Sequence, residues 1–297
     1  MNEDARSAGK LANPDRTPIA LTIAGSDSCG GAGIQADIKT FSALDVYGAS
    51  VITALTAQNT QTVSGIHDVP PQFVIDQIHT VLNDLDICAI KIGMLSNSPV
   101  IEAVATALRE YPAIPIVLDP VMVAKSGDKL LSDDALSALR DILCPLATLL
   151  TPNIPEAAIL LDLNEAQLIA GIEKHARQLS TMTGGSVLLK GGHLESRNSS
   201  DVLVHEGAIK SFEFTRIDTK NTHGTGCTLS SAIAAGLAKG FKLPDSVANA
   251  TNYVHQAIVA ADQLSIGNGH GPVHHFHAQW VKLSDCLLYT SPSPRDS

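Results

Sequence analysis

Aromatic side chains are scarce in this chain, since Phe, Trp and Tyr together make up only 4% of its 297 residues. Hydrophobic residues of all kinds nevertheless make up 44%. The core must therefore be built mainly from Ala, Val, Ile and Leu. A core of that kind is typical of parallel strands that are covered by helices on both faces.

Basic residues are also in short supply. The chain has 20 Lys and Arg residues against 30 Asp and Glu residues, which gives a formal net charge of -10. A surface of that sign argues against general affinity for nucleic acid or anionic membranes, so we expect neither as a partner. No apolar run reaches the roughly 18 residues that a membrane-spanning helix needs. A locally positive pocket for a nucleotide is still compatible with this charge.

Cysteines are few and widely spaced. Their number is odd and no C-x-x-C pair occurs, so neither a disulfide framework nor a zinc knuckle is indicated. This usage favours a reducing, cytoplasmic setting. The five cysteines are Cys29, Cys88, Cys144, Cys227 and Cys286.

The two ends of the chain lack the patterning found between them. Residues 1–17 are polar without periodicity, which predicts a loose extension. Residues 283–297 are rich in Ser and Pro, which predicts a non-native or disordered tail. Residues 18–282 contain no internal repeat and no interdomain linker, so we expect a single domain there.

Short apolar runs alternate with amphipathic segments through this domain. The alternation predicts an α/β fold with a mostly parallel central sheet and helices on both faces. Two alternating runs flank His205-Glu206-Gly207 and predict a β-hairpin over Asp201–Phe214. The predicted strands are Ile19–Ala24, Ser50–Leu55, Ala89–Ile92, Ile116–Asp119, Leu149–Thr151 and Ser186–Lys190. The predicted helices are Ala32–Leu44, Pro71–Leu85, Pro99–Arg109, Asp133–Leu143, Glu165–Thr181, Thr225–Lys239 and Leu243–Leu264.

The most informative motif is Asn221–Cys227, which runs directly into a predicted helix. Gly224 and Gly226 flank Thr225, so the backbone can turn sharply and present N–H groups at a helix N-terminus, where an anionic phosphate is favoured. Cys227 lies in the same turn, where the helix field lowers a thiol pKa toward neutrality, and a thiolate there could take a proton from a hydroxyl. Alternatively, the glycines only cap the helix and Cys227 is a small core residue.

A second glycine-rich segment, Gly25–Gly33, follows the first predicted strand. Its glycines allow a ligand to approach the backbone closely. It matches neither the P-loop, which needs Lys where Gly31 stands, nor the dinucleotide-binding pattern. A tight turn without a ligand is the alternative.

Polar residues follow several predicted strands. Asp119 ends one strand, and Asn153 and Glu156 follow the next one. Because ligands bind at the carboxyl ends of parallel strands, these groups could hold Mg²⁺ beside a triphosphate. Lys190, after another strand, and Lys220 offer cations. The alternatives are helix caps or turn residues for the first three and solvated lysines for the other two.

Four histidines near the C-terminus have the spacing H-x-x-x-H-H-x-H over residues 270–277. They have no cysteine or carboxylate partner in sequence and match no known metal-binding spacing. This favours a structural segment over a metal site.

Taken in order, these motifs resemble the hydroxymethylpyrimidine/phosphomethylpyrimidine kinases of thiamine biosynthesis, a branch of the ribokinase-like superfamily. The resemblance runs from about Ile19 to Trp280. Most sugar kinases of the superfamily have Asp where Cys227 stands, whereas cysteine is usual in this branch. The segments that carry the resemblance are Thr22–Lys39, Lys91–Leu95, Asp119–Met122, Thr151–Glu156, Lys190–His193, Asn221–Cys227 and Gly271–His277.

The resemblance implies that ATP phosphorylates the hydroxymethyl group of 4-amino-5-hydroxymethyl-2-methylpyrimidine, and that a second ATP converts the monophosphate to the diphosphate. It implies an anion hole at Gly224–Gly226, with Cys227 as the catalytic base. Members often form homodimers, so a homodimer is one expected state. The implied pyrimidine-binding residues are Gly25, Asp37, Gln58, Met94 and Val121. The implied nucleotide-binding residues are Asn153, Lys190 and Lys220, and those for Mg²⁺, directly or through water, are Asp119 and Glu156.

Three other functions fit parts of the sequence. A pyridoxine or pyridoxal kinase on the same scaffold would also phosphorylate a methylated heteroaromatic ring that bears a hydroxymethyl group. Cys227 and His223 could instead form the nucleophile–base pair of a hydrolase or transferase, although no third orienting group is evident in the sequence. A catalytically silent pyrimidine-binding protein is disfavoured, because each motif position has a competent residue.

Overall fold

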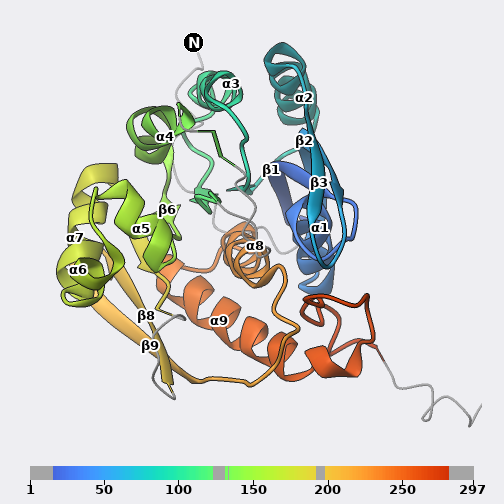
Figure 1. Ribbon diagram of the computed structural model, residues 1–297. Coiled ribbons are helices and arrows are strands. Elements are labelled where there is room, and N and C mark those ends of the chain that lie inside the picture. The colour runs from blue at the N-terminus through green and yellow to red at the C-terminus, as the bar shows by residue number, and fades with distance from the viewer. Residues whose placement is uncertain (1–15, 123–130, 133, 192–197, 281–297) are drawn as a thin grey trace, which may run out of the picture.

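Nine strands form one sheet within residues 16–122, 131–132, 134–191 and 198–280, which are the residues that the computed structural model describes (Figure 1). Their order is β3-β2-β1-β4-β5-β6-β7-β8-β9. The strands from β2 across to β7 run parallel, whereas β3, β8 and β9 pair antiparallel with their neighbours. The strands are β1 (Ile19–Asp27), β2 (Tyr47–Gln58), β3 (Val63–Asp68), β4 (Ala89–Ile92), β5 (Ile116–Leu118), β6 (Leu149–Leu150), β7 (Ser186–Leu189), β8 (Asn198–His205) and β9 (Ala208–Thr215).

Helices cover both faces of this sheet, as the apolar strands require. Successive strand residues point to opposite faces, so in β6 Leu149 packs in one core and Leu150 in the other. The core around Leu149 includes α1, α8 and α9, and the core around Leu150 includes α2 to α7. The helices are α1 (Gly33–Ala43), α2 (Pro71–Asp84), α3 (Ser98–Leu108), α4 (Ala135–Ala138), α5 (Ile154–Leu160), α6 (Glu165–Ile169), α7 (Ile172–Thr183), α8 (Thr225–Ala238) and α9 (Leu243–Val259).

The predicted fold class is confirmed, with local differences. The sequence predicted one helix over Glu165–Thr181, but α6 ends at Ile169 and α7 starts after Gly171. Strand β3 and helix α5 were not predicted. The predicted hairpin is present as β8 and β9, joined by Glu206 and Gly207, which both have positive φ as a tight two-residue hairpin turn requires.

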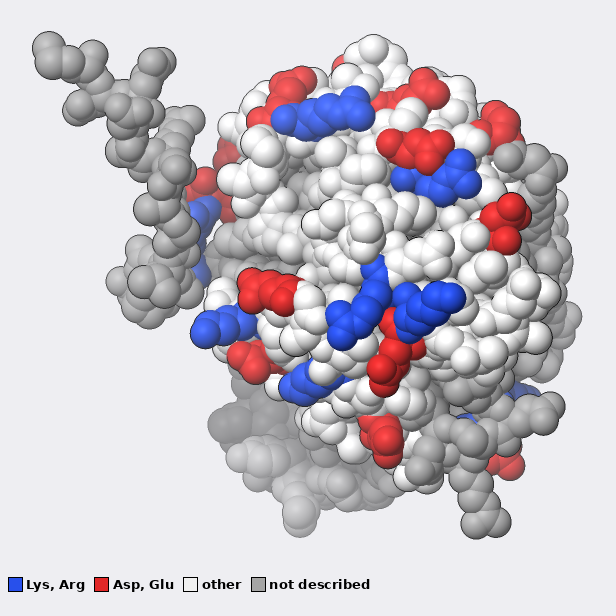
Figure 2. Space-filling model, turned by 90° about the vertical axis from the view of Figure 1, so that its left-hand side faces the viewer, with Lys and Arg blue, Asp and Glu red and all other residues white. Residues whose placement is uncertain are grey.

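The proposed extension and tail lie largely outside the described residues. Arg16, the first described residue, forms an ion pair with Asp86. None of the described helices is long and apolar enough to cross a membrane. On the face that Figure 2 shows, basic and acidic side chains of the described residues are interspersed, and neither sign covers a broad area.

The carboxyl ends of the parallel strands meet at one edge of the sheet, where ligands bind in α/β folds. Asp27 ends β1, Asp119 directly follows β5, and Lys190 directly follows β7. The N-terminus of α8 reaches this edge, since a Cβ atom built on Gly226 would lie 3.3 Å from Lys190 Nζ. The strands thus bring residues from distant parts of the sequence to the start of one helix.

Candidate active site

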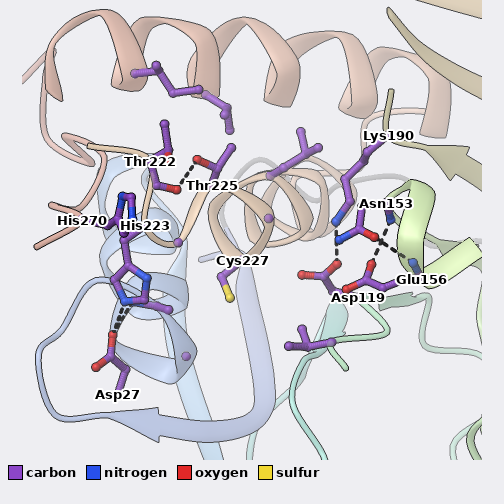
Figure 3. A pocket seen from close by; sticks show the side chains of 18 of the residues that line it. Asp27, Asp119, Asn153, Glu156, Lys190, Thr222, His223, Thr225, Cys227 and His270 are labelled. Carbon is purple, nitrogen blue, oxygen red and sulfur yellow. Dashed lines mark hydrogen bonds and ion pairs between the residues drawn. The ribbon is translucent and has the colours of Figure 1, made fainter. Parts of the chain in front are cut away.

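A cavity of about 860 Å³ opens at this edge. It is lined by every residue that the sequence nominated for the site except Asp37. Figure 3 shows the cavity with Asp27 and His223 on one side, Cys227 at its centre, and Asp119, Asn153, Glu156 and Lys190 on the other. The nominated residues that line it are Gly25, Gln58, Met94, Asp119, Val121, Asn153, Glu156, Lys190, Lys220, Gly224, Thr225, Gly226 and Cys227.

The Gly224–Cys227 turn has the backbone geometry that the sequence predicted. Gly224 is the N-cap of α8 with φ 78°, a left-handed conformation that favours glycine. A side chain there would also collide with the carbonyl oxygen of Gly31. Because the first N–H groups of a helix have no intrahelical acceptor, this turn presents donors and the positive end of the helix to the cavity.

Cys227 lies in the cavity as predicted, but the prediction of a lowered thiol pKa is wrong. The pKa of Cys227 is raised to about 11, chiefly by burial, while the charge of Lys91 opposes the shift and the charges of Asp37 and Asp119 add to it. Desolvation of the thiolate is therefore the dominant effect at this position. The residue is a neutral thiol at pH 7.

Asp119 and Lys190 form an ion pair beside the turn, with 2.9 Å between Lys190 Nζ and Asp119 Oδ1. Thr151 Oγ1 also donates to Asp119 Oδ1 at 3.2 Å. Burial opposes the charge on Lys190, but Asp119 and Glu156 outweigh it and raise the Lys190 pKa. A permanent cation and a carboxylate therefore face the start of α8.

Asn153 and Glu156 cap helix α5 and also face the cavity. Asn153 Oδ1 accepts from the Glu156 N–H at 2.9 Å, and Glu156 Oε2 accepts from the Asn153 N–H at 2.8 Å. The helix-cap alternative is thus realised, and it fixes both side chains at the mouth of the site. The pKa of Glu156 is raised to about 7, chiefly by burial, while the charge of Lys190 lowers it and the charge of Asp119 raises it.

This pair of carboxylates suits a magnesium ion that is shared with a nucleotide. Mg²⁺ usually takes one or two carboxylates from the protein, while phosphates and waters complete its shell. Within the described residues, no group of three or more His, Cys, Asp or Glu side chains could hold a metal on its own. Burial is the main cause of the raised pKa of Glu156, and a divalent cation bound beside it would favour the ionised carboxylate.

The acceptor side of the cavity combines apolar and amide groups. Met94 packs on Gly25, where an added Cβ would lie 3.3 Å from the Met94 methyl carbon. Gln58, the last residue of β2, has its Oε1 atom 3.2 Å from Thr56 Oγ1. Val121 lines the same cavity. The acceptor side therefore offers apolar contact surface for a flat ring and an amide group that can hydrogen-bond to it.

The assignment of Asp37 to the pyrimidine-binding residues is corrected, because Asp37 does not line the cavity. Its side chain is fully buried on α1 and forms an ion pair with Lys91, whose Nζ lies 2.8 Å from Asp37 Oδ2. Lys91 does line the cavity. The sequence does single out Lys91, because it is a lysine inside the otherwise apolar predicted strand Ala89–Ile92. Its partner Asp37 lies 54 residues away and could not be predicted from the sequence.

The hydrolase alternative finds no geometric support. His223 Nε2 contacts Asp27 Oδ2 at 2.9 Å, and no hydrogen bond joins His223 to Cys227 among the described side chains.

The C-terminal histidines make structural contacts: His275 Nε2 lies 3.1 Å from Thr228 Oγ1, and His270 Nδ1 lies 3.2 Å from the carbonyl oxygen of Lys220.

Known proteins resemble the chain over most of its length. A family model described as phosphomethylpyrimidine kinase matches residues 27–274. The hydroxymethylpyrimidine/phosphomethylpyrimidine kinase of Rhizobium meliloti (strain 1021) is 54% identical over 268 residues, which covers 89% of this chain and 99% of the relative.

Two solved kinase structures are similar to this chain in fold. The phosphomethylpyrimidine kinase from Clostridium difficile 630 is 40% identical, with a TM-score of 0.71 over 81% of this chain and 99% of that one. The pyridoxal kinase of Bacillus subtilis, solved as an ADP complex, is 33% identical, with a TM-score of 0.82 over 90% of this chain and 100% of that one. The chain belongs to the phosphomethylpyrimidine kinase family.

Proposed function

We propose that this protein transfers a phosphoryl group from ATP to 4-amino-5-hydroxymethyl-2-methylpyrimidine, and then a second one to the resulting monophosphate, in thiamine biosynthesis. One observation carries the proposal beyond family membership. The Gly224–Cys227 turn opens α8 into the cavity with the Lys190–Asp119 ion pair directly beside it. This is the arrangement that a migrating phosphoryl group needs, because its transition state depends on positioning and on charge stabilisation.

The site divides into an acceptor side and a donor side. We assign the pyrimidine ring to Gly25, Gln58, Met94 and Val121, with the hydroxymethyl group directed at Cys227. We assign the nucleotide to the side of Asn153, Lys190 and Lys220. The transferred phosphoryl group then lies over the turn, where backbone N–H groups and the Lys190 ammonium neutralise its equatorial oxygens.

Asp119 and Glu156 are the residues that would hold Mg²⁺. When bound, this ion supplies positive charge to the phosphate oxygens. Lys190 keeps its own charge throughout, since its pKa is raised. We expect the ring to exclude water from the turn once the acceptor is bound, which strengthens these electrostatic contacts.

A coupled ADP-release assay with three acceptors tests the function. The aminopyrimidine alcohol and its monophosphate are expected to be substrates, with higher kcat/KM values than pyridoxine. The likeness to the Bacillus subtilis pyridoxal kinase makes pyridoxine the appropriate competitor. A kcat/KM for pyridoxine that exceeds the value for the pyrimidine alcohol would reassign the protein to that activity.

Replacing Cys227 by alanine tests its role as the proton acceptor. A base acts only when deprotonated, and below a pKa of about 11 the thiolate fraction falls about tenfold for each pH unit. The wild-type kcat should therefore rise between pH 7 and pH 9. We expect Cys227→Ala to lower kcat about 100-fold, to leave the KM for the alcohol nearly unchanged, and to remove this rise. The same pH slope in both proteins would assign the proton to another acceptor.

A further inference from the structure

His223 connects the turn at α8 to two other segments of the chain, the end of β1 and residues 271–273. Its Nε2 atom lies 2.9 Å from Asp27 Oδ2 at the end of β1 (Figure 3), and 3.5 Å from Gln58 Nε2 at the end of β2. Its backbone N–H donates to the Gly271 carbonyl oxygen at 3.0 Å, and its own carbonyl accepts from the Val273 N–H at 3.3 Å. The residue that precedes Gly224 is thus fixed through both its backbone and its ring.

Asp27 organises the glycine-rich loop with the same carboxylate. Its Oδ1 atom accepts from the N–H of Cys29 at 2.9 Å. Its Oδ2 atom accepts from the N–H groups of Gly31 at 3.1 Å and Ala32 at 2.8 Å, besides meeting His223. One carboxylate thus joins the loop to the residue before the turn.

The loop and the turn are also packed without spare room. A side chain on Gly31 would collide with the imidazole ring of His223, and a side chain on Gly224 would collide with the carbonyl oxygen of Gly31. Each glycine is therefore required by the close approach of the other segment. A shift of either segment would open the contact between them.

The charge state of the pair follows from its surroundings. Burial would raise the pKa of Asp27, but hydrogen bonds from His223 and from backbone N–H groups outweigh it and lower the pKa. The carboxylate is ionised and can only accept, so the His223 Nε2 atom that faces it carries a proton. That nitrogen is therefore a donor and cannot accept from Gln58 Nε2, so the 3.5 Å separation of these two nitrogens is a contact and not a hydrogen bond.

We propose that Asp27 and His223 are a positioning pair, which holds the Gly224–Cys227 turn in its phosphate-binding conformation by tying it to the 27–33 loop. Neither residue is assigned a bond to the reacting atoms. The kinetic consequence rests on the proposed kinase function. Both phosphorylation steps use the same turn, so loss of the pair should slow both to a similar extent.

A double-mutant cycle tests whether the two residues act as a unit. We expect Asp27→Asn and His223→Gln each to lower kcat about 10- to 100-fold, because a small misplacement of the turn is costly, while the KM for the pyrimidine alcohol changes less than about twofold. The double variant should be no slower than the slower single variant. Single effects that multiply in the double variant, or a kcat equal to that of wild type, would overturn the proposal.

His175→Gln is the matched control. His175 is also buried, but its Nδ1 atom contacts the carbonyl oxygen of Leu168, between α6 and α7 and away from the cavity. This variant should lose stability without a change in kcat. A comparable fall in its kcat would show that general loosening of the fold, and not the pair, slows the enzyme.

Amide hydrogen exchange of the unliganded protein tests the pair without reference to activity. Both site variants should exchange faster than wild type in a peptide that spans residues 221–229, and the control should not. Unchanged exchange in both variants would overturn the positioning role. If the wild-type protein failed to phosphorylate the pyrimidine but these exchange differences appeared, the pair would stand and the proposed function would fall.

Discussion

A Gly226→Val variant is expected to turn over at least about 100 times more slowly than the wild-type enzyme. A Cβ atom at this position would lie 3.3 Å from Lys190 Nζ and 3.4 Å from Asp119 Oδ2. The branched valine side chain would extend further, displace the Lys190 ammonium and occupy the space that the phosphoryl group needs. Loss of one oxyanion donor in other enzymes costs about 100- to 1,000-fold in kcat, and this substitution disturbs both the cation and the turn.

The measurement is kcat for the pyrimidine alcohol, made on protein whose circular dichroism and melting temperature match those of the wild type. Gly65→Val is the control, since Gly65 lies on the edge strand β3, where an added Cβ would have only an ordinary contact, 3.9 Å from Ala57 Cβ. The control should retain wild-type turnover. Near-normal turnover by a folded Gly226→Val protein would show that this turn is not the anion hole.

The parts of the site that could be predicted are those with local sequence signals. The Gly224–Cys227 turn was predicted because two glycines flank Thr225 at the start of a long apolar helix, and this geometry depends on the backbone alone. Asp119 and Lys190 were predicted because each directly follows an apolar strand, and parallel strands end at the same edge. Strand β3 was missed because it is a short edge strand whose residues are largely exposed, so it lacks an apolar run.

The parts that could not be predicted depend on contacts across the fold. Lys91 pairs with Asp37 over 54 residues, and His223 pairs with Asp27 over 196 residues. Neither pairing leaves a periodic pattern in the sequence. The thiol pKa of Cys227 was predicted in the wrong direction for the same reason: the helix end is a local feature, whereas the burial that raises the pKa comes from the whole fold.

A Lys91→Met variant is expected to lose about 3–5 kcal/mol of unfolding free energy, because removal of one partner leaves a buried charge uncompensated. Both side chains of the Lys91–Asp37 pair are fully buried. Without the ammonium, the Asp37 carboxylate would keep, among the described side chains, the hydroxyl groups of Thr22, at 2.6 Å, and Ser231, at 2.7 Å. Urea denaturation measures the loss.

Lys239→Met is the matched control for this substitution. Lys239 contacts Asp45 at 3.9 Å on the surface, and the Asp45 side chain is 94% exposed. An exposed pair of this kind contributes less than about 1 kcal/mol, so the control should unfold close to the wild type. An equal loss in both variants would show that the methionine itself, and not the buried charge, lowers the stability.

Replacing both members of the buried pair separates its effect on stability from its effect on turnover. A Lys91→Met/Asp37→Leu variant should recover part of the free energy that Lys91→Met loses, because no unpaired charge is left in the core. We expect the turnover of both Lys91→Met and the double variant to be lower than that of the wild type. Lys91 lines the cavity, and the charge of Lys91 favours the thiolate form of Cys227. Recovery of turnover together with stability would reduce the pair to a packing element, whereas recovery of stability alone places the Lys91 charge in the chemistry of the site.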